Sequence, residues 1–178
     1  MKKVLWIIGG IAVVLLIAFI ALRSYTKSAS PEATAEVNQN GLRIKVDYCQ
    51  PSKKGRKIFG GLVPYGEVWR TGANEATTID FDQNVTVAGQ PLDEGKYTLW
   101  TIPSQNNWIV IFNKETGQWG TNYDQTKDVL RVPVAFRKRS NVAEQFYISF
   151  APHSGGTNML LTWDQTEVTV PIQLRTND

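Results

Sequence analysis

The sequence predicts an all-β protein, a Greek-key β-sandwich of the immunoglobulin-like or jelly-roll kind, preceded by one N-terminal transmembrane helix. Three observations lead to this prediction. Residues 4–22 form an unbroken apolar run, alternation of apolar and polar residues dominates after residue 31, and residues 93–97 (DEGKY) have the spacing of a tyrosine corner. With 178 residues, the chain has room for one domain with a single core after the N-terminal run.

The apolar run at residues 4–22 predicts a membrane anchor, since at 1.5 Å per residue it covers roughly the 30 Å of a hydrocarbon core. The alternative is a signal peptide that is cleaved at the small residues 28–30, followed by secretion. The apolar stretch of a signal peptide usually has only about 7 to 15 residues, and Pro31 disfavours cleavage at that point. The anchor is therefore preferred. Lys2, Lys3 and the amino terminus make the N-terminal flank slightly more basic than the flank with Arg23 and Lys27, which favours a cytoplasmic N-terminus at residues 1–3 and the following domain in the periplasm or outside.

Residues 23–31 are polar and end in proline, which predicts a linker before a sandwich domain at residues 32–178. The formal net charge of +3 comes from bases in the N-terminal segment, where no acid accompanies Lys2, Lys3, Arg23 and Lys27. The remaining chain is nearly neutral, which argues against a nucleic-acid partner. The membrane, contacted through residues 4–22, is therefore the first predicted partner.

Alternation predicts the strands one by one. Residues 33–37 and 42–48 flank Asn40-Gly41 and predict a hairpin. Further strands are predicted at residues 77–81, 85–87, 97–102, 108–112, 129–136, 146–150, 159–163 and 168–174. In the tyrosine corner, the Tyr97 hydroxyl is expected to bond back to the main chain, with Leu99 in the core. Residues 137–139 (RKR) are expected at a solvated hairpin tip.

Two connections, residues 50–76 and 113–128, exceed the roughly 12 to 15 residues of ordinary loops. The first is expected to pack as a belt on the core through its apolar residues, namely Ile58, Phe59, Leu62, Val63, Tyr65, Val68 and Trp69. The second contains Trp119, which is the best candidate for an exposed or pocket-lining ring. If both connections lie at one end of the sandwich, Trp119 and its neighbours face the first connection.

A polar cluster at the end of the first connection has two interpretations. The candidate ligand-binding residues of the two connections are Arg70, Asn74, Glu75, Trp119, Tyr123 and Asp124. In one interpretation, Arg70 binds an anionic or carbonyl oxygen, Glu75 accepts from hydroxyls, and Asn74 does both. In the other, Arg70 and Glu75 pair with each other or with loop carbonyls. The second interpretation is slightly favoured, because a long packed loop buries main-chain groups that need partners.

Familiar catalytic chemistry finds little support in the sequence. His153 is the single histidine, so a histidine-rich zinc site is excluded, and no P-loop or dinucleotide fingerprint occurs. Cys49 is the single cysteine, which excludes an intramolecular disulfide, and no histidine lies near it in sequence. No metal and no cofactor are expected.

Several long motifs identify the family that the chain resembles. They are PSKKGRKIFGGLVPYGEVWRTGANEATTIDF, EGKYTLWTIP, WIVIFNKETGQWG, YDQTKDVLRVPV and LTWDQTEVTVPI. Over residues 30–172 the chain resembles the bacterial domain-of-unknown-function family 2911. The resemblance implies an exported or membrane-tethered β-sandwich and supplies no activity, substrate or catalytic residue. Many members begin with an ordinary cleaved export signal, and the longer apolar run of this chain departs from that pattern.

The predicted function is a membrane-anchored extracytoplasmic binding or interaction module of the cell envelope, with an unknown small ligand or envelope protein as partner. One alternative is a carboxylate-dependent hydrolase that acts on envelope carbohydrate or peptide through Glu75. The other is a purely structural envelope protein. The lack of a recognisable catalytic constellation favours a binding module over an enzyme.

Overall fold

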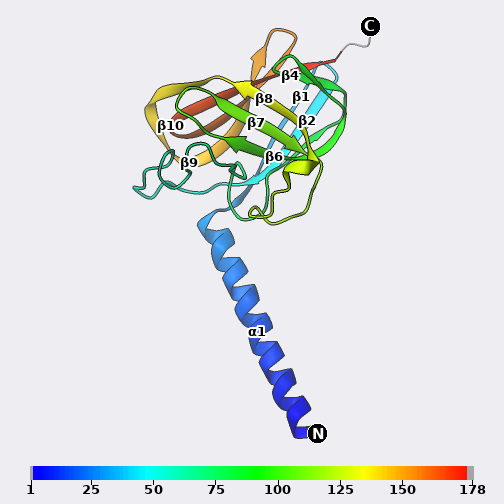
Figure 1. Cartoon of the computed structure of the whole chain (residues 1–178), viewed down its shortest axis with the longest axis vertical. Helices are drawn as coiled ribbons and strands as arrows, with labels where there is room; N and C mark the ends of the chain where they lie inside the picture. The colour runs from blue at the N-terminus through cyan, green and yellow to red at the C-terminus, as the bar shows by residue number, and fades with distance from the viewer. Residues whose placement is uncertain (1, 176–178) are drawn as a thin grey trace.

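The computed structural model describes residues 2–175. A long helix, α1 (Lys2–Ala29), projects from one end of a β domain (Figure 1). None of its most apolar window is buried against the rest of the chain, and the helix is long and apolar enough to cross a membrane or to act as a signal sequence. The apolar surface of α1 therefore has no partner within the described residues.

The helix continues through much of the polar segment at residues 23–31 that was interpreted as a linker. It is helical as far as Ala29, and strand β1 begins at Glu32. Pro31 disfavours the helical conformation in the residue before it, which explains the end of the helix. The N–H of Gln50 donates to the Pro31 carbonyl at 2.8 Å, so the start of the sandwich is fixed directly after the helix.

Two antiparallel sheets form the β domain. The first has the strand order β1-β2-β3-β6-β7-β8, and the second has the order β5-β4-β10-β9. The strands are β1 (Glu32–Gln39), β2 (Leu42–Cys49), β3 (Thr78–Phe81), β4 (Val85–Val87), β5 (Gln90–Leu92), β6 (Gly95–Ile102), β7 (Trp108–Asn113), β8 (Asp128–Val134), β9 (Phe136–His153) and β10 (Gly156–Leu174), with a 3-10 helix η1 (Gln125–Lys127) before β8. The prediction of an all-β sandwich behind one N-terminal apolar helix is confirmed.

Two local predictions are also confirmed. Asn40 and Gly41 join β1 to β2 with φ angles of 53° and 78°, as a two-residue hairpin turn with positive φ at both positions requires. The Tyr97 hydroxyl donates to the Asp93 carbonyl at 2.8 Å, and Leu99 is fully buried. The tyrosine corner therefore closes the crossing from β5 into β6.

The last two strands are longer than predicted. Residues 137–139, expected at a hairpin tip, lie inside β9, and β10 unites the two runs predicted at 159–163 and 168–174. Glu167 on β10 explains the error, because it pairs with Arg137 at 2.6 Å and with Arg139 at 3.5 Å across the strands. A strand segment that is stabilised by such cross-strand ion pairs lacks the alternation of apolar and polar residues from which strands are predicted.

The first long connection packs partly into the core. Trp69 stacks on Trp163 with ring centroids 5.8 Å apart, and Phe59 meets the Trp108 ring edge-to-face at 4.8 Å. The belt prediction is correct for Ile58, Phe59, Val63 and Trp69 and wrong for Leu62, Tyr65 and Val68, which are exposed. Gly60 and Gly66 turn the chain sharply with φ angles of 75° and 80°, so the apolar residues cannot all face the core.

Candidate functional site

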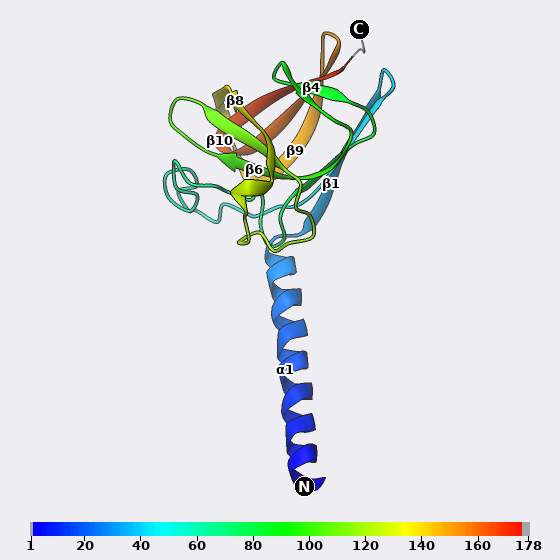
Figure 2. The same ribbon diagram turned by 45° about the vertical axis from the view of Figure 1, so that its right-hand side comes forward.

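The two long connections meet at the end of the sandwich from which α1 leaves (Figure 2). The N–H of Ala76 donates to the Gln118 carbonyl at 3.3 Å, and the N–H of Gly120 donates to the Asn74 carbonyl at 3.0 Å. Between these bonds, Glu75 and Trp119 lie opposite each other in an antiparallel bridge. The two connections therefore lie at one end of the sandwich, and their contact fixes Glu75 and Trp119 opposite each other.

Arg70 holds the second connection in place next to this bridge. Its Nη1 donates to the Gly120 carbonyl at 2.9 Å, and burial lowers the pKa of the Arg70 guanidinium. Gly120 lies so close that a Cβ on it would stand 2.1 Å from Arg70 Cδ and 2.6 Å from the Asn74 carbonyl oxygen. Arg70 and Glu75 form no ion pair among the ten found in residues 2–175. Arg70 thus has the loop-carbonyl contact of the bracing interpretation.

Asn74 faces the end of α1. It adopts a positive φ of 59°, which asparagine tolerates better than most residues. Its Nδ2 lies 3.5 Å from the carbonyl oxygens of Thr26 and Ser30 and 3.7 Å from Cys49 Sγ. Burial, reinforced by the charge of Glu75, raises the pKa of the Cys49 thiol.

Glu75 faces the helix and not Arg70. Its Oε1 lies 3.2 Å from Arg23 Nη2 and 3.8 Å from Lys27 Nζ. The two bases stand four residues apart and therefore share one face of α1. Because the Glu75 side chain is 33% exposed, each of these pairs contributes only about 0–1 kcal/mol, and a ligand can replace it at low cost.

An open cleft of about 540 Å³ lies between the end of α1 and strands β1 and β2, and we name it the junction cleft. It is lined by Arg23, Lys27, Glu32, Ala33, Thr34, Asp47, Tyr48, Cys49, Glu75, Ala76 and Thr78. The bases come from the helix and the acids from the sandwich. The junction cleft therefore offers charge-assisted hydrogen bonds of both kinds to one bound molecule.

A second opening of about 420 Å³ separates Trp119 from the helix, and we name it the Trp119 crevice. Its lining consists of Phe19, Leu22, Arg23, Thr26, Glu75, Gly117 and Trp119. The Trp119 residue is 41% exposed, as expected from its place in the sequence, although it is the largest apolar side chain of its loop. Glu75 belongs to both openings, and it stands on the wall that separates them.

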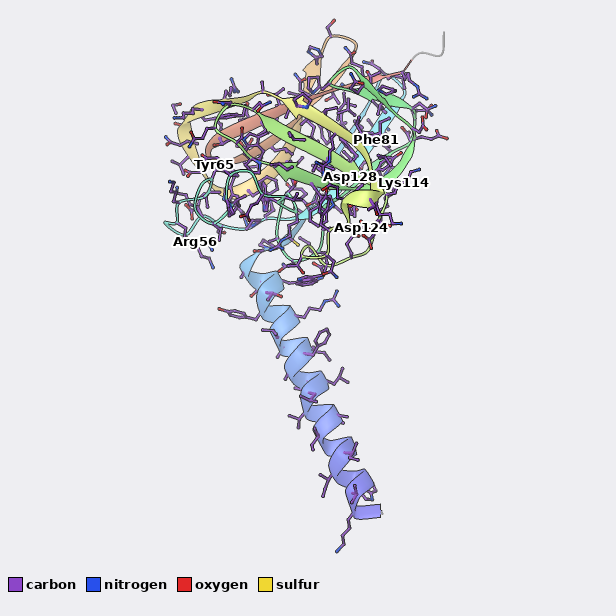
Figure 3. All side chains as sticks on the ribbon, in the orientation of Figure 1. Arg56, Tyr65, Phe81, Lys114, Asp124 and Asp128 are labelled. Carbon is purple, nitrogen blue, oxygen red and sulfur yellow. The ribbon has the colours of Figure 1, made fainter. Side chains whose placement is uncertain are left out.

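Tyr123 and Asp124 take part in a separate polar group. The Tyr123 hydroxyl donates to Asp128 Oδ2 at 2.6 Å and accepts from Arg131 at 2.7 Å. Burial and the neighbouring Asp128 raise the pKa of Tyr123 to about 12. Asp124 caps η1 by accepting from the N–H of Thr126 at 2.9 Å, and Figure 3 shows Asp124 and Asp128 on the same part of the molecule. Neither Tyr123 nor Asp124 lines the junction cleft or the Trp119 crevice.

Comparison with known proteins shows the family of the chain. A family model described as "Protein of unknown function (DUF2911)" matches residues 30–172, from just before β1 into the last part of β10. The chain belongs to the DUF2911 family. This membership confirms the resemblance inferred from the long motifs. A search of the curated proteins and a search of the solved structures each found no match.

The DUF2911 match begins at Ser30 and therefore includes Glu75 and Trp119 but not Arg23 and Lys27. Sequence reasoning missed these two bases and treated them only as a flank of the apolar run. Their spacing of four residues was the available signal, because it places them on one helix face once the helix extends past residue 22. Within residues 2–175, no group of three or more His, Cys, Asp or Glu side chains is placed to hold a metal ion.

Proposed function

We propose that this DUF2911 protein is a membrane-anchored binding module of the bacterial cell envelope. In this proposal α1 crosses the cytoplasmic membrane, and the sandwich stands in the periplasm or outside. The module binds a small ligand, or a short segment of an envelope protein, in the junction cleft. The observation that carries the proposal is the junction cleft itself, in which helix bases and sandwich acids surround a space large enough for such a ligand.

The anchor is supported by the surface of α1. Its apolar side chains are exposed along the helix, and such a surface is stable only when lipid or another apolar partner covers it. Lys2, Lys3 and the amino terminus before the apolar run exceed Arg23 and Lys27 after it by one positive charge, and the bias of basic groups toward the cytoplasmic side then favours the sandwich on the opposite side.

The proposed ligand carries both a cationic and an anionic group. Arg23 and Lys27 would hold its anionic group, while Glu75 and Asp47 would hold its cationic group. Peptide termini and free amino acids have this chemistry. Glu75 already pairs with two bases, which suits recognition of charge better than the donation of a proton.

The binding test uses the full chain in lipid nanodiscs and a panel of amino acids and short peptides with free termini. Thermal unfolding is compared for the wild type, Glu75→Gln, and the matched control Glu115→Gln, whose side chain is exposed outside the junction cleft. A ligand at 100 times its dissociation constant stabilises the protein by about 2.7 kcal/mol. We expect at least one member of the panel to stabilise the wild type and Glu115→Gln, and to stabilise Glu75→Gln much less. An equal shift in all three proteins, or no shift at all, would refute the proposed binding site.

The anchor is tested separately. We expect the full chain to resist extraction from membranes by alkaline carbonate and to have the intact mass of the uncleaved protein. Protease added outside spheroplasts is expected to degrade the sandwich. A mature protein that lacks residues 1–28 would contradict the anchor.

A further inference from the structure

We propose that Trp119 is a membrane-contact residue whose ring lies in the interfacial layer of the bilayer that holds α1. The second long connection would then seat the sandwich on the lipid surface in one orientation. This inference rests on the membrane anchor of the proposed function and adds an interaction surface to it. It does not depend on which ligand the junction cleft binds.

The depth of Trp119 follows from the residues beside it. The apolar residues 4–22 span about 28 Å as a helix, which nearly equals the hydrocarbon thickness of a bilayer. Leu22 therefore lies near the boundary between hydrocarbon and headgroups. Trp119 lines a crevice together with Phe19 and Leu22, so its ring stands at the level of the last apolar turn.

The chemistry of the second connection suits that layer. Tryptophan is enriched at membrane interfaces because its ring is apolar and its N–H is polar. Residues 117–123 carry no charged side chain, and the carboxylate beside Trp119, that of Glu75, is paired with Arg23 at 3.2 Å. Arg23 and Thr26, which also line the Trp119 crevice, lie one and four residues beyond Leu22, where the headgroup layer begins.

The position of Trp119 relative to the helix is held by several contacts. The bonds from Ala76 to Gln118 and from Gly120 to Asn74 flank Trp119 on its own loop. The ion pair between Arg23 and Glu75 connects the opposing loop to α1. A bilayer that surrounds residues 4–22 therefore meets the Trp119 ring unless this end of the sandwich moves away from the helix.

The same placement orients the remaining surfaces. The tips of the β1–β2 and β9–β10 hairpins lie at the end of the sandwich opposite α1 (Figure 2). When the sandwich lies on the lipid surface in this orientation, these tips point away from the lipid and the junction cleft lies at the headgroup level. An exposed ring that stacks on a carbohydrate is the competing role for Trp119, and it requires the ring to be open to water.

Depth-dependent quenching of tryptophan fluorescence tests the inference in liposomes that contain the full chain. The Trp6→Phe variant removes the exposed tryptophan of α1, and the other four tryptophans, Trp69, Trp100, Trp108 and Trp163, are buried. The difference between Trp6→Phe and Trp6→Phe/Trp119→Phe gives the emission of Trp119 alone. The matched control adds His153→Trp to the second variant, because His153 lies at the tip of the β9–β10 hairpin.

We expect phospholipids brominated near the headgroup end of the acyl chain to quench Trp119 several-fold more than the reporter introduced by His153→Trp. Aqueous iodide is expected to show the reverse order. If the protein floats with the liposomes while iodide reaches both tryptophans equally and bromolipid reaches neither, the membrane contact is refuted and the anchor stands. If the protein does not float with the liposomes, the anchor and this inference both fail.

Discussion

Gly120→Ala tests the packing between the two long connections most directly. The added Cβ would stand 2.1 Å from Arg70 Cδ and 2.6 Å from the Asn74 carbonyl oxygen, both far inside contact distance. The Arg70 side chain can rotate away, but the Asn74 carbonyl belongs to the main chain and accepts the Gly120 N–H at 3.0 Å. Relief therefore requires the two loops to separate. Overpacking of this kind costs roughly 1–3 kcal/mol, which corresponds to a fall of roughly 4–8 °C in the melting temperature at the middle of that range.

The assay is thermal unfolding of the full chain in nanodiscs, followed by near-ultraviolet circular dichroism. The matched control is Thr121→Ala, the exposed neighbour, for which we expect a change within about 0.5 kcal/mol. If Gly120→Ala unfolds at the same temperature as Thr121→Ala, the two loops do not approach as closely as the described contacts require. Both the fixed position of Trp119 and the shared wall of the two openings would then lose their physical basis.

Two further predictions concern the remaining candidate residues. Arg70→Ala is expected to lower the free energy of unfolding by roughly 1–2 kcal/mol, because it leaves the Gly120 carbonyl without its donor. Glu75→Ala removes partly exposed ion pairs and is expected to lower it by less than about 1 kcal/mol. Urea unfolding measures both variants, and equal losses would contradict this division of roles. For Tyr123, burial and Asp128 raise the pKa from 10.0 to about 12, so the folded state holds the proton more tightly than the unfolded state. Its contribution to stability is complete below pH 10 and is lost as the pH approaches 12. The difference in tyrosinate absorbance between the wild type and Tyr123→Phe reports the ionisation of Tyr123. A Tyr123 signal already at pH 10 would show that its pKa is not raised.

The sequence was sufficient where a structure depends on neighbours in the chain. The hairpin at Asn40-Gly41 needs two adjacent residues that accept positive φ, and the tyrosine corner needs Tyr97 four residues after Asp93. Both requirements can be checked within a few positions. The long apolar run and the alternating strands likewise follow from periodicity over short windows.

The sequence was insufficient where a contact joins distant residues. Glu75 lies 52 positions from Arg23, and Arg70 lies 50 positions from Gly120, so local patterns do not indicate which partner each side chain takes. The sequence offered Arg70 and Glu75 either each other or loop carbonyls as partners, without indicating which carbonyl, and Arg70 takes the carbonyl of Gly120. In the fold, Glu75 pairs with Arg23 at the end of α1, and Arg70 donates to Gly120 of the second connection. Arg70 therefore stabilises the loop contact, whereas Glu75 lines the junction cleft.

The junction cleft depends on a part of the chain that the DUF2911 match does not include. Arg23 and Lys27 precede residue 30, while Glu32, Asp47 and Glu75 lie within the matched range. Cleavage at residues 28–30 would remove both bases and leave a wall that is acidic only. The anchored form would therefore suit a ligand with both an anionic and a cationic group, whereas the cleaved form would suit a ligand with a cationic group alone. Retention of the helix is thus part of the proposed recognition chemistry as well as of the proposed attachment to the membrane.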